Sequence, residues 1–368
     1  MVIYPDAIWL GGRLCPDMAV EHDGATITRI RPCTASERPA SGNPAVLIPA
    51  CTDLQVNGSG GVMLNSAPTV EGIAAIVAAQ RAVGTGRVMP TLITTDLETM
   101  RQATQAALRA WSGPSRVEGF AGLHLEGPYL NPRRKGTHDP AYMRPFDAEL
   151  PDMLAPLRAA GMPVKVTLAP EMTGPDPIRQ LAAMGVIVSA GHTAATADEA
   201  KDAIAAGLSC FTHLYNAMPQ MQSRDPGVIA AAINSDCHAG IIADGYHVYW
   251  DMIAIACNAR PDPRRMFAVS DAMATINGPD HFTLYGERID VRDGMLVNAS
   301  GSLAGAHITL LECLRNLVVH VGLPAARAID MCTDIPNGVI GLEPLALMPG
   351  TPLDLCVALD DQWVRRAI

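Results

Sequence analysis

Several features common in secreted, membrane and redox proteins are missing from this sequence. No uninterrupted apolar stretch approaches the roughly 18 residues that a membrane-spanning helix needs. Residues 1–6 lack a basic segment followed by an apolar run, so we expect no secretory signal and no membrane attachment. The nine cysteines are scattered without a C-x-x-C pair, which predicts buried free thiols in a reducing compartment, the cytoplasm.

Charge is also scarce. Charged residues make up 17% of the 368 residues, and the net charge of −10 argues against binding nucleic acid or anionic membrane by bulk electrostatics. Hydrophobic residues make up 49%, so the chain can bury a large core and is globular rather than disordered. Any anion that this protein binds must therefore be held by local donors.

Short apolar runs alternate with amphipathic helical stretches over most of the chain. Near-continuous apolar strands followed by helices indicate a parallel sheet covered by helices. Eight such units in about 300 residues fit a TIM-type (β/α)8 barrel better than an open sheet. The predicted strands cover residues 46–56, 88–93, 120–125, 164–168, 186–190, 210–214, 241–243 and 266–269.

The two ends of the chain have a different pattern. Residues 1–47 and 345–368 contain short β-type runs among glycine and proline, which predicts a small β-sandwich domain formed by both termini. The barrel would then cover residues 48–344. Within it, the capping box of Thr196 and Glu199 predicts a helix over 197–206. Residues 282–285 and 295–297 predict an inserted hairpin that turns at 292–294.

Unusual polar residues stand at the ends of the predicted strands. Glu126 closes the third strand, His192 the fifth, His213 the sixth and Asp271 the eighth. In a barrel the carboxyl ends of the strands converge on one face, which is where barrel active sites lie. Two imidazoles and a carboxylate leave an open coordination position for water, as in catalytic zinc sites. Asp271 could then take a proton from that water and return it to a leaving amine.

Structural roles compete with functional ones for some of these residues. A single histidine at a strand end is more often a hydrogen-bonded structural residue, although three ligands with an aspartate favour a metal site. His124, two residues before Glu126, could support the metal site or fill the barrel core. Residues 58–61 do not fit G-x-G-x-x-G and indicate a tight turn instead of a phosphate-binding loop.

Taken together, these segments resemble the amidohydrolase superfamily over nearly the whole chain, and most closely its deacetylases of amino-sugar phosphates. The resemblance rests on eight ordered segments, 53–58, 122–128, 135–140, 191–193, 212–219, 224–227, 241–247 and 270–272. It implies hydrolysis of the N-acetyl group of an N-acetyl-hexosamine 6-phosphate, foremost the gluco sugar, to the amino sugar phosphate and acetate.

The resemblance also implies roles for individual residues. Glu126, His192 and His213 would bind the metal, Asp271 would act as general base and then general acid, and His138 would contact the sugar or the acetyl carbonyl. Asn216, the Ala217 backbone, Arg224 and His247 would hold the phosphate. Further substrate contacts would come from Thr137, Asp244, Gly245, Tyr246, Leu303, Ala304 and Gly305.

Gln55 and Asn57 stand where most amidohydrolases have His-x-His, which binds a further metal. The chain thus resembles the single-metal branch, with one divalent ion per subunit, expected to be Zn²⁺ with Fe²⁺ or Co²⁺ as alternatives. The resemblance also implies a homodimer with phosphate contacts across its interface. His307 departs from relatives and either alters sugar preference or is a solvated or helix-starting residue. Residues 133–135 could add positive charge at the mouth of the site, although we expect Arg133 and Arg134 in a solvated loop.

Two rival functions remain open at this level. Another amidohydrolase acting on N-acyl amino acids or cyclic amides would not need the phosphate residues Arg224 and His247. A non-catalytic barrel scaffold would have lost the ligands or Asp271, which are all present. The sequence does not distinguish an equatorial from an axial 4-hydroxyl on the sugar, and it does not name the metal.

Overall fold

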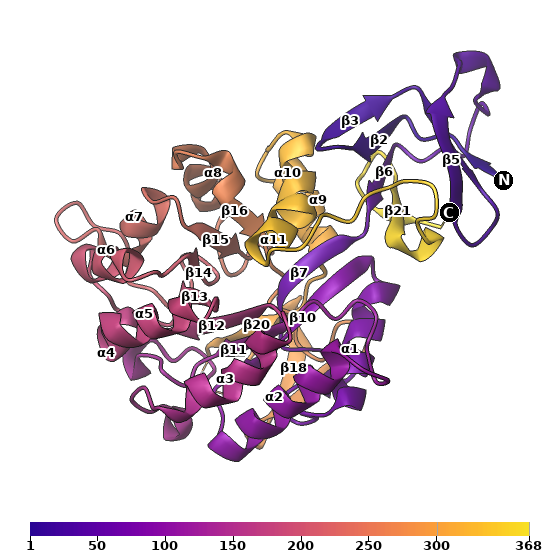
Figure 1. The fold of residues 1–368 in the computed structure, drawn as a ribbon. Coiled ribbons are helices and arrows are strands. Elements are labelled where there is room, and N and C mark those ends of the chain that lie inside the picture. The colour runs from indigo at the N-terminus through magenta and orange to yellow at the C-terminus, as the bar shows by residue number, and fades with distance from the viewer. Residues whose placement is uncertain (300, 368) are drawn as a thin grey trace.

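Eight parallel strands in consecutive order form the centre of the fold (Figure 1), seen in a computed structural model that describes residues 1–299 and 301–367. The Val56–Ala272 bridge and a 3.0 Å hydrogen bond from the Asp271 amide to the Gln55 carbonyl bring the first strand against the chain that follows the last. The predicted (β/α)8 barrel is confirmed. Its strands are β7 (Cys51–Val56), β10 (Thr85–Ile93), β11 (Leu123–Glu126), β12 (Val164–Leu168), β13 (Ile187–Ala190), β14 (Cys210–Phe211), β15 (His238–Ile241) and β16 (Met266–Ala268).

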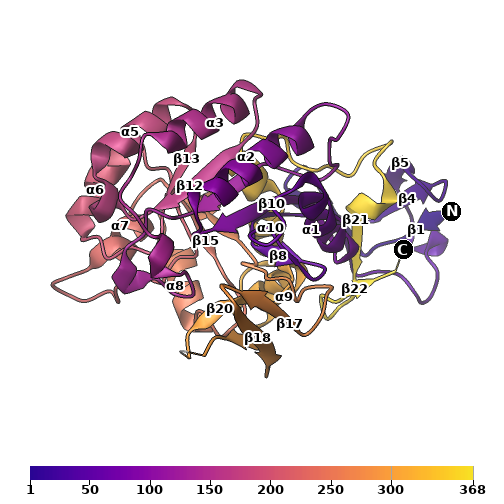
Figure 2. The same cartoon turned by 90° about the horizontal axis from the view of Figure 1, so that it is seen from below.

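Helices cover the outside of this barrel (Figures 1 and 2). The capping box at Thr196 and Glu199 is formed, and it begins helix α6 where the sequence predicts it. Apolar side chains of helices and strands share one large buried cluster, so the helices shield both the strands and the barrel interior. The helices are α1 (Val70–Ala82), α2 (Leu97–Trp111), α3 (Glu149–Ala159), α4 (Pro170–Thr173), α5 (Pro175–Ala183), α6 (Ala197–Ala205), α7 (Gly227–Ile233), α8 (Trp250–Ala259), α9 (Leu310–Val319), α10 (Ala325–Cys332) and α11 (Asp334–Val339).

The first predicted strand, 46–56, is wrong as one element because it divides at Ala50. The Ala50 amide donates to the Leu355 carbonyl, which draws the preceding residues away from the barrel. Strand β6 (Val46–Pro49) therefore pairs with β21 (Cys356–Leu359) in a second sheet. The seventh barrel strand also differs from the prediction, since β15 begins at half-buried His238 and its first residue carries no apolar signal.

Segments from both ends of the chain form a separate β domain beside the barrel, and both termini lie there in Figure 1. One sheet has the order β22-β21-β6-β2-β3, and a second has the order β1-β4-β5. A buried apolar cluster that includes Ile8, Val20, Ile27 and Leu47 joins them. We keep the limits 1–47 and 345–368 as a proposal for this domain. The remaining strands are β1 (Val2–Ile3), β2 (Ala7–Leu10), β3 (Arg13–Pro16), β4 (Met18–His22), β5 (Ile27–Pro32) and β22 (Arg365–Arg366).

The insertion before α9 is a four-stranded antiparallel sheet, so the prediction of a single hairpin is wrong (Figure 2). The turn at 292–294 is present, but the strand at 281–284 pairs through a second turn at Tyr285 and Gly286. Both turns place residues at positive φ. The strands are β17 (His281–Leu284), β18 (Glu287–Arg292), β19 (Met295–Val297) and β20 (Leu303–Ala306); β20 borders the carboxyl end of the barrel through the Ala272–Ala306 bridge.

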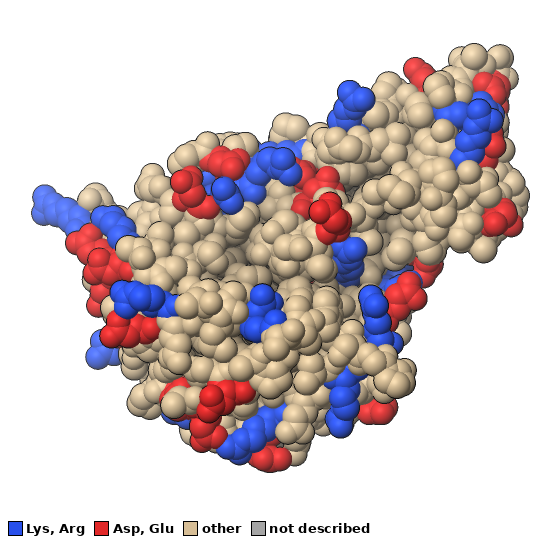
Figure 3. Space-filling view, viewed as in Figure 1, with Lys and Arg blue, Asp and Glu red and all other residues tan. Residues whose placement is uncertain are grey.

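The face shown in Figure 3 carries basic and acidic residues interspersed around a largely uncharged centre. All nine cysteines are free thiols, and eight of them are buried. Within the described ranges, no helix has the length and apolar character needed to cross a membrane. The short ribbon of β8 (Gly58–Ser59) and β9 (Val62–Met63) turns at Gly60 and Gly61, which agrees with the tight turn expected there.

Candidate active site

The predicted polar residues at the strand ends converge on one face of the barrel. His192, His213 and Asp271 each follow a strand and have φ of 48°, 30° and 53°. This left-handed region is unusual for residues other than glycine and is often found at functional sites. Here the sharp turn of the chain after each strand directs the side chain into the barrel mouth instead of along the sheet.

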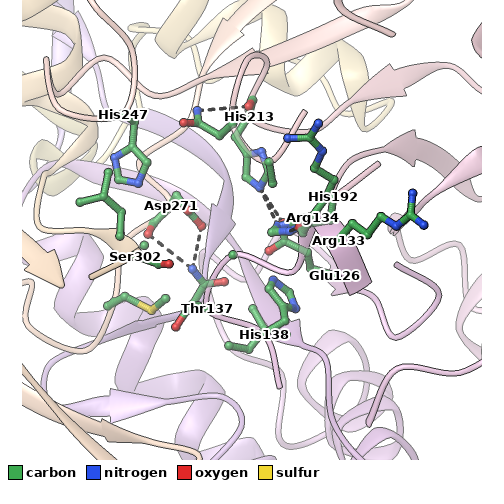
Figure 4. A pocket seen from close by; sticks show the side chains of 18 residues that line it. Glu126, Arg133, Arg134, Thr137, His138, His192, His213, His247, Asp271 and Ser302 are labelled. Carbon is green, nitrogen blue, oxygen red and sulfur yellow. Dashed lines mark hydrogen bonds and ion pairs between the residues drawn. The ribbon is translucent and has the colours of Figure 1, made fainter. Parts of the chain in front are cut away.

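Glu126, His192 and His213 form a compact group (Figure 4). His213 Nε2 lies 3.0 Å from Glu126 Oε1, and His192 Nε2 lies 3.4 Å from the same oxygen. The two Nε2 atoms are 3.1 Å apart. All three side chains are buried. One potential ligand atom from each residue lies within 4.8 Å of the others, which is the arrangement of a cation site.

The donor set fits a divalent metal. Nδ1 of His192 donates to the carbonyl oxygen of Arg134 at 2.8 Å, so the neutral ring has its lone pair on Nε2, the atom that faces the other ligands. The two Nε2 atoms face each other beside the Glu126 oxygen, so one cation could be shared by all three ligand atoms. Two nitrogens and one oxygen suit zinc and similar ions and leave an open position.

Contacts within this group shift the pKa values of Glu126 and His192 in opposite directions. Burial alone would raise the pKa of Glu126, but hydrogen bonds to His192 and His213 outweigh it and hold the pKa well below its usual range. Burial would lower the pKa of His192, and the same contact with Glu126 raises it instead. The Glu126 carboxylate is therefore ionised, as a metal ligand has to be.

Asp271 stands beside the three ligands and is held by two amides. Gln55 Nε2 donates to Asp271 Oδ1 at 3.0 Å and also to both oxygens of Glu126, at 3.2 and 3.3 Å. Asn57 Nδ2 donates to the same Oδ1 at 2.7 Å. Burial raises the pKa of Asp271, and the negative charge of Glu126 adds to the rise. A buried carboxyl with one fixed oxygen and one unfixed oxygen suits proton transfer.

These residues line a cavity of about 320 Å³, large enough for a sugar-sized molecule. His138 lies on its wall, buried, with its ring 4.3 Å from that of His192. Burial lowers the pKa of His138 well below its usual value, and the nearby His192 lowers it further, so the ring is neutral. Residues predicted as site residues that line the cavity are Glu126, Thr137, His138, His192, His213, Asn216, Ala217, His247, Asp271, Leu303 and Gly305.

His247 reaches the cavity from the loop after β15. Its Nδ1 lies 2.6 Å from Asp244 Oδ2, and the other Asp244 oxygen accepts the amides of Tyr246 and His247. Asp244 thus holds His247 from behind and, unlike His247, does not border the cavity. Tyr246 is half exposed and donates to the Asp293 carbonyl, and Gly245 packs on Trp250. Direct substrate contact by Asp244, Gly245 and Tyr246 is therefore not supported.

Other predicted residues lie apart from the cavity. Arg224 is exposed and does not border it within this chain. Ala304 is fully buried in the apolar cluster under the inserted sheet. His124 is buried inside the barrel between the hydroxyls of Thr91 and Thr167, which makes it a core residue. His307 contacts Thr275 Oγ1 at 2.8 Å and likewise does not border the cavity.

Some cavity residues were not predicted. Arg133 and Arg134 border the cavity beside His192, whereas His247 lies across it (Figure 4), so the alternative of positive charge at the site mouth describes them better than a solvated loop alone. The run of basic residues allowed both interpretations, and the conformation of the 3-10 turn over Pro132–Arg134 decides between them. Asn57, Ile93, Met273 and Ser302 also line the cavity.

A TIM-type barrel with a Glu-His-His cluster and an aspartate at its carboxyl end defines a metal-dependent hydrolase. The chain belongs to the amidohydrolase family, whose model matches residues 46–358. It is 36% identical to N-acetylgalactosamine-6-phosphate deacetylase of Shewanella sp. strain ANA-3, over 86% of this chain and 80% of that one. It is 34% identical to N-acetylglucosamine-6-phosphate deacetylase of Haemophilus influenzae, over 79% and 76%.

Solved structures agree with this. The chain is similar to the crystal structure of N-acetylglucosamine-6-phosphate deacetylase from Pasteurella multocida, with a TM-score of 0.86 and 31% identity over 99% of this chain and 96% of that one. The Mycobacterium smegmatis deacetylase, solved as a mutant with N-acetyl-D-glucosamine-6-phosphate, also has a TM-score of 0.86, with 29% identity over the same shares. The relatives therefore include enzymes named for the gluco sugar and for the galacto sugar.

Proposed function

We propose that this protein removes the N-acetyl group from an N-acetyl-hexosamine 6-phosphate and releases acetate, with N-acetylglucosamine 6-phosphate as the first substrate to test. The observation that supports the proposal most is that one cavity is lined by Glu126, His192, His213 and Asp271. The relatives that match most of the chain act, by their names, on phosphorylated N-acetyl sugars of gluco or galacto configuration.

Glu126, His192 and His213 would hold one divalent ion, for which we propose Zn²⁺, with Fe²⁺ or Co²⁺ as alternatives. When bound, such an ion polarises an amide carbonyl and lowers the pKa of water. Gln55 and Asn57 direct N–H donors at Glu126 and Asp271 rather than lone pairs at a second ion. This supports one metal per subunit.

The proton moves through Asp271 in this proposal. Its Oδ1 is held by Gln55 and Asn57, so Oδ2 takes the proton from the attacking water. The same carboxyl then gives that proton to the leaving nitrogen of the amino sugar, which is released as the amine. His138 would donate a hydrogen bond from the cavity wall to the substrate amide or sugar.

For the phosphate we propose His247, Asn216 and the Ala217 backbone from this chain, with Arg224 supplied by a second subunit of a homodimer. The exposed position of Arg224 supports its use across an interface. Arg133 and Arg134 add positive charge to the cavity of a chain with net charge −10. We place the enzyme in the cytoplasm, as its eight buried free thiols suit a reducing compartment.

A substrate panel tests the proposal. Acetate release should be fast with the gluco or galacto N-acetyl-hexosamine 6-phosphate and at least about 100-fold slower in kcat/KM with the same sugars lacking phosphate. Faster hydrolysis of N-acyl amino acids or cyclic amides would assign the protein to another branch of the family. The ratio between the two phosphorylated sugars settles which configuration this cavity prefers.

A further inference from the structure

Thr94 is the first residue after strand β10 and is almost fully buried. Each of its polar groups has a partner at the site. The amide donates to His138 Nδ1 at 3.4 Å, and the hydroxyl lies 2.7 Å from the same nitrogen. The hydroxyl also lies 3.3 Å from the carbonyl oxygen of Glu126. Thr94 therefore connects His138 directly to the strand that carries a metal ligand.

The backbone around Thr94 is held in place on both sides. Asn65 brackets the preceding residue Ile93, accepting from its amide at 3.1 Å and donating to its carbonyl at 2.9 Å. The Thr94 carbonyl accepts a 2.5 Å hydrogen bond from the Tyr285 hydroxyl of the inserted sheet. Thr94 is thus a fixed point rather than a mobile loop residue.

Gly127 makes room for this arrangement. A Cβ atom at Gly127 would lie 2.2 Å from Thr94 Oγ1, and Gly127 has φ of +91°, a conformation that side chains disfavour. The residue directly after the ligand Glu126 therefore has to be glycine for the Thr94 hydroxyl to reach both the Glu126 carbonyl and His138.

The amide of Thr94 determines which nitrogen of His138 carries the proton. A backbone N–H can only donate, so Nδ1 must present its lone pair. The hydroxyl has one hydrogen, and in this tautomer the shorter contact, 2.7 Å to Nδ1, takes it in preference to the Glu126 carbonyl at 3.3 Å. A neutral ring then carries its proton on Nε2, the nitrogen left for the cavity that His138 lines. In the opposite tautomer the buried Thr94 N–H would face the Nδ1–H of His138 and lose its acceptor, which costs free energy.

We propose that Thr94 is a positioning residue that holds His138 through its Nδ1 with the Nε2–H directed into the cavity, where it donates to an oxygen of the bound amide substrate. This rests on the proposed function for the identity of the substrate. The orientation of His138 can be measured without substrate.

Paired variants test the role in turnover. Thr94→Val keeps the volume and removes the hydroxyl, and kcat on the preferred N-acetyl-hexosamine 6-phosphate should fall about 10- to 100-fold with KM within about 3-fold. Thr94→Ser should restore kcat to within about 3-fold of wild type. Thr91→Val is the matched control, because it removes a hydroxyl that contacts the core residue His124 at 3.1 Å and should leave kcat within about 3-fold.

Nitrogen NMR of zinc-loaded protein with ¹⁵N-labelled histidine gives the second readout, with the His138 signals assigned by their loss in His138→Gln. Wild type should show an unprotonated Nδ1 and a protonated Nε2. Thr94→Val keeps the backbone donor and should keep this tautomer, while its Nδ1 signal should shift because the hydroxyl contact is lost. A wild-type Nδ1–H tautomer, or equal losses in Thr94→Val, Thr94→Ser and Thr91→Val, would overturn the proposal. If wild type hydrolyses no phosphorylated sugar, the proposed function fails, while the spectrum still decides the role of Thr94.

Discussion

The side-chain amide of Asn57 donates a 2.7 Å hydrogen bond to Oδ1 of Asp271, and this contact joins the first barrel strand to the last. Gln55 donates to the same oxygen and to Glu126. Together these amides fix the carboxyl and leave its second oxygen for chemistry. In the proposed function they take the place of two further ligands that could bind another metal.

Replacing Asp271 tests the proton transfer. Asp271→Asn keeps the shape and the hydrogen-bonding position but removes the base, so kcat should fall by about 10²- to 10⁴-fold. Metal content, measured by elemental analysis, should stay near that of wild type because Asp271 is outside the ligand group. Asp361→Asn, an exposed substitution of the same kind, is the control. If Asp271→Asn keeps more than about a tenth of wild-type kcat, another group moves the proton.

Arg224 tests the phosphate site. A charged hydrogen bond is worth roughly 1.5–3 kcal/mol, so Arg224→Ala should lower kcat/KM on the 6-phosphate about 10- to 200-fold. The free N-acetyl sugar should be almost unaffected. Equal losses on both sugars, or none, would remove Arg224 from phosphate binding.

The exposed position of Arg224 calls for a mixing experiment. In a mixed dimer of Arg224→Ala and Asp271→Asn subunits, one cavity combines an intact Asp271 with Arg224 from its neighbour. Random exchange of equal amounts should therefore restore about a quarter of wild-type activity if Arg224 acts across the interface. Activity that stays at the level of the separate variants would place Arg224 in its own subunit's site or outside any site.

The sequence predicted the barrel and the converging polar residues because both follow from local rules. Apolar runs that alternate with helices define parallel strands, and residues at the strand ends must meet on one face. The same rule points to Thr94, which directly follows the second strand, but its role depends on His138 from another loop. The place of Arg134 was left open and the order of the inserted strands was missed, because loop conformation and strand pairing depend on contacts between distant segments. The division of the first predicted strand at Ala50 has the same cause, because β6 pairs with β21 from the far end of the chain.

Asp53 tests the electrostatics of the barrel interior. Burial raises its pKa to about 7, although the amides of Gln55 and Ser270 donate to it. A carboxyl whose pKa is higher folded than unfolded binds more protons in the native state, so its stability contribution is full below about pH 4 and is lost as pH rises through about 7. Asp53→Asn should therefore gain on the order of 1–4 kcal/mol relative to wild type between pH 5 and 8. Denaturant unfolding at both pH values, with Asp361→Asn as control, measures it; a difference that does not change with pH contradicts the assignment.

The central claim is that one metal ion held by Glu126, His192 and His213 supports amide hydrolysis in this cavity, and titration of metal-free protein tests it most directly. Zinc is added in steps to protein stripped by chelation, and acetate release from N-acetylglucosamine 6-phosphate and its galacto counterpart is followed at each step. Activity should be absent without metal, rise linearly and level off at one equivalent per chain, while Glu126→Gln should require far more zinc. Full activity in stripped protein, or a rate that levels off only at two equivalents, would contradict the account.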